Sequence, residues 1–265
     1  MLENFEIQHP EPLTEPLPDL EKPTLKSPES AGPESGQMEN FSSPEGRALE
    51  PEVRHDVPNC EEAWVTGGPF DAADRMDIKQ GDNPYHAAGN CGLVSICNTL
   101  RRAGMDVTEN DVTKTAIDNG LCHYDPNGPP GENGGTNLEM RRQVLALFGI
   151  DSEICRPGCG GSLEDIAGAI DSGRGVVISV SADLLWDEDM GGVGLFGPQS
   201  NHCVAVTGIA RDAATGEIAG VYIADSGRGL EGDACRYLTV GEFDEVYTNV
   251  WGTGANITTG PLMGG

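Results

Sequence analysis

Basic residues are scarce in this sequence. Its 265 residues include 16 Lys and Arg, of which only four are lysine, against 43 Asp and Glu, so the formal net charge is −27 at pH 7. Such a surface repels phosphate groups, which argues against nucleic acid as a partner, and an anionic membrane is disfavoured for the same reason. A basic protein substrate or partner would be attracted instead. Solubility or adaptation to salt would explain the charge equally well.

Long apolar runs and a secretory leader are also lacking. No run approaches the roughly 18–20 residues that cross a bilayer, and the first twenty residues have no basic region followed by an apolar one. We therefore expect no membrane insertion and no Sec signal peptide, so that export would need a specialised system or a larger delivery protein. The eight cysteines are too few and too irregularly spaced for a disulfide scaffold.

Residues 1–58 differ in composition from the rest of the chain. They hold ten of the 18 prolines, no cysteine or tryptophan, and 13 acidic against four basic residues. A segment of this kind cannot bury enough apolar surface to offset the cost of ordering the chain. We predict a disordered Pro/Glu-rich linker over 1–58 and one folded catalytic domain over 59–265.

Helix-start signals recur in that domain. Ser or Thr is followed three residues later by Asp or Glu in four places, and glycines mark the ends of the segments that follow. The expected N-caps and their third residues are Thr108 with Asp111, Thr136 with Glu139, Ser162 with Asp165, and Thr239 with Glu242. The helices are predicted over 92–103, 109–118, 137–148 and 163–171, with a short one over 240–247.

Strand signals dominate the second half. GVVISVSA (175–182) is almost wholly apolar and β-branched, and HCVAVTGIAR (202–211) and EIAGVYIADS (217–226) flank the turn sequence DAATG. The latter two segments should form an antiparallel hairpin, and we expect ANITTG (255–260) to close the sheet. Helices first and strands later predict an α+β fold, with an N-terminal helical part packed on a C-terminal antiparallel sheet.

Cys91 lies where the first of the core helices begins. In GNCGLVSICNTLRRAG (89–104) the apolar stripe starts at Leu93, so Cys91 falls at the cap or in the first turn. The free N–H groups there favour an anion, and this placement is expected to lower the pKa of a thiol below its usual value of about 8.5. Gly92 would leave the backbone open to a substrate. A buried core thiol is the structural alternative.

A cysteine nucleophile needs a base and a group that orients that base. His202 begins a strand, whereas the other histidines of the domain lie in Gly/Pro/Asn-rich loops. Asp225 ends the adjacent strand of the expected hairpin, which brings its carboxylate back beside His202. The Cys91 N–H, with Gln80 as the second donor, is the candidate oxyanion hole.

These segments resemble the papain-like cysteine peptidase superfamily. NCGLVSICNTLRRAG, NHCVAVTG and VYIADSG are similar in particular to papain-fold toxin domains of bacterial polymorphic toxins and to bacteriocin-leader peptidases. The resemblance covers about residues 78–258. It implies Cys91 as nucleophile, His202 as base, Asp225 as its orienting group and Gln80 in the oxyanion hole, with no cofactor or metal.

One departure from that pattern concerns Gln80. The glutamine of papain-like enzymes stands closer to the cysteine than Gln80 does to Cys91, because NPYHAAGN intervenes here. Either the loop bulges, or Asn90 or another group serves instead. The toxin resemblance further implies action on a protein in the cytoplasm of a target cell and a cognate immunity protein in the producer.

Other readings of the same residues remain open. Attack on a glutamine side chain would make the chain a deamidase or transglutaminase with the same catalytic residues. A zinc-binding structural module is the alternative from another class, with Cys155, Cys159, Cys60, Cys122, His123 and Cys203 as the available ligands. Cys155 and Cys159 could also form a disulfide. The Gly-rich segment 183–201 before His202 is either a gate over a cleft or an ordinary connection.

Overall fold

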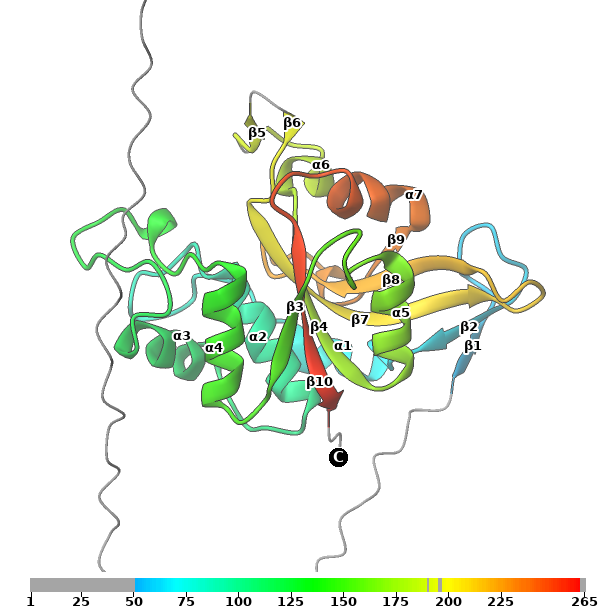
Figure 1. The fold of residues 1–265 in the computed structure, drawn as a ribbon, viewed down its shortest axis with the longest axis horizontal. Coiled ribbons are helices and arrows are strands. Elements are labelled where there is room, and N and C mark those ends of the chain that lie inside the picture. Colours follow the sequence, from blue (N-terminus) through cyan, green and yellow to red (C-terminus); the bar gives the residue numbers. More distant parts are fainter. Residues whose placement is uncertain (1–50, 190, 195–196, 263–265) are drawn as a thin grey trace, which may run out of the picture. The chain divides into compact units, whose positions relative to one another are not determined.

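The computed structural model of this chain describes residues 51–189, 191–194 and 197–262 (Figure 1). Contacts between Cα atoms divide the chain into two units, Met1–Ser43 and Pro44–Gly265, and every described residue belongs to the second. Most of the segment predicted as a linker therefore lies outside the described residues. Its last part includes strand β1 (Glu52–Arg54), so ordered structure begins before residue 59.

Four helices form the N-terminal part of the fold: α1 (Pro69–Met76), α2 (Cys91–Arg102), α3 (Glu109–Asp118) and α4 (Leu138–Leu147). Apolar side chains spaced three or four residues apart along α2 face α3 and α4, as the sequence pattern predicts. With side chains of α3 and α4 they form one buried cluster. Its fully buried members are Leu93, Ile96, Cys97 and Leu100 from α2, Val112 and Ala116 from α3, and Val144 and Leu145 from α4.

Three of the four predicted capping boxes are present, on α3, on α5 (Leu163–Asp171) and on the short helix α7 (Val240–Phe243). The fourth was assigned to the wrong residue. Asn137 caps α4 by accepting from the N–H of Met140, at 2.9 Å. Thr136 cannot do so because its hydroxyl is turned toward Gly92.

The main sheet is antiparallel throughout. Strand β7 (His202–Asp212) is its longest member. Along one edge β7 pairs first with β4 (Arg174–Val180) and then with β2 (Ala63–Thr66), and its other edge pairs with β8 (Ile218–Ala224). β10 (Gly254–Pro261) lies between β4 and β3 (Ser152–Cys155), β9 (Arg236–Thr239) pairs with β8, and β1 pairs with β2. The predicted hairpin of β7 and β8 is confirmed.

Helices cover both faces of the sheet at β4 and β7, which explains why both strands are apolar and buried. Ile178, Val204 and Val206 point to the face that packs on α5. Ser179 and Cys203, partners in the β4–β7 register, point to the opposite face, toward α2 and α4. Figure 1 shows α2 and α4 on one side of these strands and α5 on the other.

Short elements complete the described fold. Helix α6 (Ala182–Trp186) follows β4 and precedes a two-stranded ribbon of β5 (Val193–Gly194) and β6 (Gly197–Pro198). Single turns are formed by η1 (Pro130–Glu132), η2 (Asp233–Cys235) and η3 (Asp244–Thr248). No helix within the described ranges is both long and apolar enough to cross a membrane. The architecture is the predicted α+β fold with a helical part packed on an antiparallel sheet.

Candidate active site

Cys91 is the first residue of α2 and is partly exposed. The carbonyl of Asn90 accepts the N–H groups of Leu93 and Val94, at 2.9 and 3.0 Å, which closes the first turn. Within the described part of the chain, no hydrogen bond uses the N–H of Cys91. This amide and the positive end of α2 are therefore available to an anion beside the thiol.

The Cys91 thiol shares a hydrogen bond with the thiol of Cys203, the second residue of β7. That contact and burial raise the pKa of Cys91 above its ordinary value, whereas the positive charge of Arg141 opposes the rise. The helix start alone predicts a lowered pKa for Cys91, and this prediction is wrong while the thiol is hydrogen-bonded to Cys203. Two neighbouring thiols cannot both ionise easily, so the hydrogen bond with Cys203 raises the pKa of Cys91.

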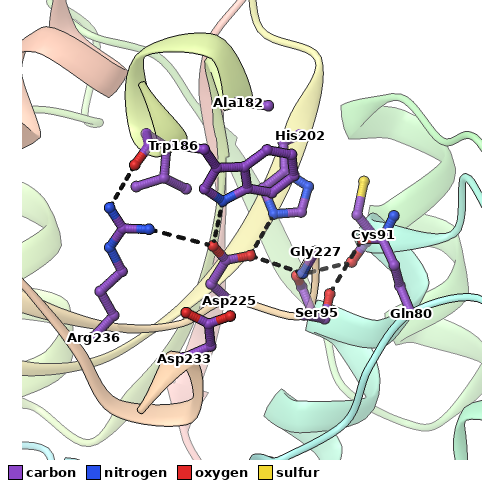
Figure 2. A network of polar contacts seen from close by, with 12 residues as sticks. Gln80, Cys91, Ser95, Ala182, Trp186, His202, Asp225, Gly227, Asp233 and Arg236 are labelled. Atoms are coloured by element: carbon purple, nitrogen blue, oxygen red, sulfur yellow. Dashed lines mark hydrogen bonds and ion pairs between the residues drawn. The ribbon is translucent and has the colours of Figure 1, made fainter. Parts of the chain in front are cut away.

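His202 and Asp225 are in direct contact. Nε2 of the His202 ring lies 2.8 Å from Oδ1 of Asp225, and both side chains are almost fully buried. The contact arises because β8 runs back along β7 and ends beside the start of that strand. With Nε2 held by the carboxylate, Nδ1 is the ring nitrogen left to exchange a proton, and Figure 2 shows it on the side of the ring toward Cys91. Among the hydrogen bonds of the described residues, none joins this ring to Cys91.

Asp225 is surrounded by donors. Its Oδ2 accepts the indole N–H of Trp186 at 2.8 Å, its Oδ1 accepts the backbone N–H of Gly227 at 2.9 Å, and a guanidinium nitrogen of Arg236 lies 3.9 Å from Oδ2 (Figure 2). Burial alone would raise the pKa of Asp225, but the His202 contact and these N–H groups lower it to about 2. The carboxylate is therefore ionised under ordinary conditions and holds one orientation of the imidazole.

Trp186 is a site residue that sequence reasoning missed. Besides donating to Asp225, its ring packs on the His202 ring with centroids 4.8 Å apart. Trp186 lies at the end of α6 in the segment 183–201, which sequence left as either a gate or a plain connection. The only available signal was a tryptophan within that Gly-rich segment, shortly before the histidine.

Gln80 lies close to Cys91 although eleven positions separate them in sequence (Figure 2). The loop between them folds back, and its closure is held by a hydrogen bond from Nε2 of Gln80 to the carbonyl of Ala88, at 3.0 Å. The backbone N–H of Gln80 donates to the carbonyl of Ser226, the residue after Asp225. The loop therefore bulges, and among the described residues one amide hydrogen of Gln80 has no hydrogen-bond partner.

Asn90, the alternative to Gln80, has another role. Its buried amide donates to Glu109 Oε1 at 2.7 Å and to Thr113 Oγ1 at 3.1 Å, and its Oδ1 accepts the N–H of Gly81. Both amide hydrogens are therefore engaged away from the thiol. Asn90 ties the Gln80 loop to α3 and offers no donor to an oxyanion.

The zinc alternative finds no support in the described residues, where no three His, Cys, Asp or Glu side chains are gathered as ligands. All eight cysteines are free thiols, including Cys155 and Cys159. Cys159 is exposed, and Cys155, the last residue of β3, is buried in the core.

Comparisons with known proteins identify the family of this chain. The model of the Peptidase_C39-like family matches residues 76–254. Two solved structures are similar at low identity. One is a double-glycine-motif protease from an AMS/PCAT transporter in complex with a leader peptide (16% identity, TM-score 0.41, 68% of this chain and 89% of that chain). The other is a C39-like peptidase from Bacillus anthracis (17%, TM-score 0.45, 78% and 97%). No curated protein matches.

The family match spans more than half of the chain, including Gln80, the start of α2 and both strands of the β7–β8 hairpin. This chain belongs to the Peptidase_C39-like family and is a cysteine peptidase of papain-like fold.

Proposed function

We propose that Cys91, His202, Asp225 and Gln80 carry out peptide-bond hydrolysis on a protein substrate. The observation that carries the proposal is the buried His202–Asp225 contact beside the start of α2. A fixed imidazole with Nδ1 free is what a thiol needs as its base. Rotation of Cys91 about its Cα–Cβ bond would exchange its Cys203 partner for this ring.

The reaction then follows from the groups present. Sγ of Cys91 attacks the carbonyl carbon while its proton passes to Nδ1 of His202. The oxyanion is stabilised by the free N–H of Cys91 and by the uncommitted amide hydrogen of Gln80. The imidazolium gives its proton to the leaving amine, and water, deprotonated by the same ring, releases the acyl group from sulfur.

We further propose that this peptidase is an antibacterial toxin domain that acts in the cytoplasm of a target cell and is blocked by an immunity protein in the producer. Support comes from the resemblance of the motifs around Cys91 and His202 to papain-fold toxins. The acidic, proline-rich residues 1–58 are suited to linking such a domain to a delivery protein. The net charge of −27 favours a substrate or partner with a basic surface.

Expression in a bacterial cytoplasm tests both levels of the proposal. Wild type, Cys91→Ala and the exposed-thiol control Cys159→Ala would be compared for growth and for new protein N-termini by mass spectrometry. We expect new termini with wild type and Cys159→Ala but not with Cys91→Ala, and growth arrest in the same two cases. Cleavage without growth arrest would contradict the toxin role alone. Glutamine converted to glutamate without new termini would show a deamidase instead.

A further inference from the structure

Arg141 of α4 is a buried cation next to the candidate nucleophile. It is only 1% exposed, and its guanidinium points toward the first turn of α2. A Cβ atom added to Gly92 would lie 3.2 Å from Cδ of Arg141. A buried guanidinium beside the positive end of a helix is strongly unfavourable unless an anion lies next to it.

The hydrogen-bond partners of Arg141 identify that anion. Nε donates to Oδ1 of Asn256 at 3.0 Å, Nη2 donates to Oγ of Ser179 at 2.6 Å, and Nη1 donates to Sγ of Cys203. A carboxamide and a hydroxyl do not ionise in the working range of pH. Cys203 is therefore the one acidic group in contact with Arg141 in the part of the chain that the structure describes.

Two neighbouring side chains, Cys91 and Arg141, favour the ionised form of Cys203. The hydrogen bond from Cys91 lowers the pKa of Cys203, burial opposes this, and the charge of Arg141 lowers it further. Arg141 from α4, His202 from β7 and the end of α2 are the charged or titratable features that face the two sulfurs. β4 and β10 contribute only the uncharged Ser179 and Asn256.

We propose that Arg141 and Cys203 form a buried guanidinium–thiolate pair that positions the Cys91 thiol and sets the pH at which it becomes nucleophilic. The inference rests on the proposed role of Cys91 as nucleophile. Cys203 keeps the negative charge and accepts the S–H of Cys91, so Cys91 rests as a protonated thiol. Arg141 and Cys203 are positioning residues, and neither is assigned contact with the substrate.

The first measurement locates the thiolate by its ultraviolet absorbance during a pH titration. We expect one thiolate at neutral pH in wild type and in Cys91→Ala, and none in Cys203→Ser. Burial raises the pKa of Cys97 to about 12 and those of Cys122 and Cys235 to about 11. These thiols therefore stay protonated at neutral pH and add no thiolate absorbance. A Cys159→Ser background removes the exposed thiol. An absorbance lost in Cys91→Ala and kept in Cys203→Ser would overturn the proposal.

The second measurement follows the alkylation of Cys91 by iodoacetamide against pH, with the modified peptides read by mass spectrometry. Cys203→Ser removes an anion and keeps Arg141, so the midpoint for Cys91 should fall by about one pH unit or more. Arg141→Gln should raise the midpoint, whereas Arg141→Lys keeps the charge and should lie closer to wild type. A purely structural role would leave the midpoint unmoved, and an unchanged midpoint in Cys203→Ser would overturn the proposal.

These readouts do not depend on peptide-bond cleavage. A chain that cleaves no protein but shows the Cys203 thiolate would contradict the proposed function and leave the pair intact. Should Arg141→Gln fail to fold, as a thermal melt would reveal, the Cys203→Ser and Cys91→Ala results decide the question by themselves.

Discussion

The indole N–H of Trp186 donates to Asp225 at 2.8 Å, and it uses the carboxylate oxygen that the His202 hydrogen bond leaves free. The same indole ring packs on the imidazole. Trp186 therefore fixes both the carboxylate and the ring that the carboxylate orients. Under the proposed mechanism, a residue from α6 would therefore act on the reaction through His202 and Asp225, outside the proton path.

Trp186→Phe removes the N–H and keeps most of the ring. We expect kcat/KM for a cleaved substrate to fall by about tenfold, because one charge-assisted hydrogen bond that holds Asp225 is lost. Trp64→Phe is the matched control, since Trp64 lies 45% exposed on β2 and outside the site. Equal kinetics of the two variants would show that the indole N–H does not support catalysis.

Asp225→Asn tests the pH dependence of stability. The pKa of Asp225 is lowered from 3.8 to about 2 in the folded chain, so its stabilisation is complete above the unfolded value and is lost as the pH falls toward 2. This difference in pKa between the folded and the unfolded chain corresponds to about 2 kcal/mol of stabilisation. The free-energy difference between wild type and Asp225→Asn, measured by urea unfolding, should therefore shrink by that amount between about pH 5 and about pH 2. Asp118→Asn, an exposed carboxylate on α3, should differ from wild type by little at any pH.

Substitutions of Gln80 and Asn90 should have different effects. The Gln80 variant should lose catalytic rate, and the Asn90 variant should lose stability. Gln80→Ala removes a proposed oxyanion donor, so kcat should fall by about a hundredfold while KM changes little. Asn90→Ala strips buried partners from Glu109 and Thr113 and should lower the free energy of unfolding by about 1–3 kcal/mol. Steady-state kinetics and urea unfolding on both variants check this. Asn90→Ala with full stability and a large loss of kcat would reverse the two assignments.

Gly92 is required by close packing rather than by backbone conformation. A Cβ atom there would lie 2.2 Å from Oγ1 of Thr136, so Gly92→Ala should displace the start of α2 and lower both stability and activity. Thr136→Ala removes that oxygen, and the double variant should recover much of the loss. The recovery is measured as a coupling energy in a double-mutant cycle. Additive effects would show that Thr136 is not the obstacle.

Local signals in the sequence predicted the elements that local physics determines. The capped helices α3 and α5 begin and end where expected, because their Ser, Thr and acidic residues bond to neighbouring backbone. β7 and β8 pair as predicted across their turn, which is why the contact of His202 with Asp225 could be anticipated. α6 was missed because five residues carry too little periodicity to recognise.

The rest of the site depends on tertiary contacts that no local pattern encodes. Arg141 looks like any charged helix residue, and only the packing of α4 on β3 and β10 shows that it is buried. The packing of α2 on β7 brings Cys203 to Cys91, and the pKa of Cys91 is then raised instead of lowered. Trp186 reaches Asp225 from a separate segment. The sequence therefore predicted the contact of residues that lie on one hairpin, such as His202 and Asp225. It did not predict contacts made by residues of other elements, such as Arg141 and Trp186.

The place of β10 bears on when the enzyme can become active during its own synthesis. This strand follows the other strands along the chain, yet it lies inside the sheet between β4 and β3 and carries Asn256, an acceptor for Arg141. While residues 254–261 are still within the ribosome, β3 lacks its partner and the guanidinium beneath the thiols lacks a ligand. A nascent chain that already displays both Cys91 and His202 therefore still lacks part of the surroundings of the proposed catalytic residues, and we expect no cleavage until residues 254–261 have left the ribosome.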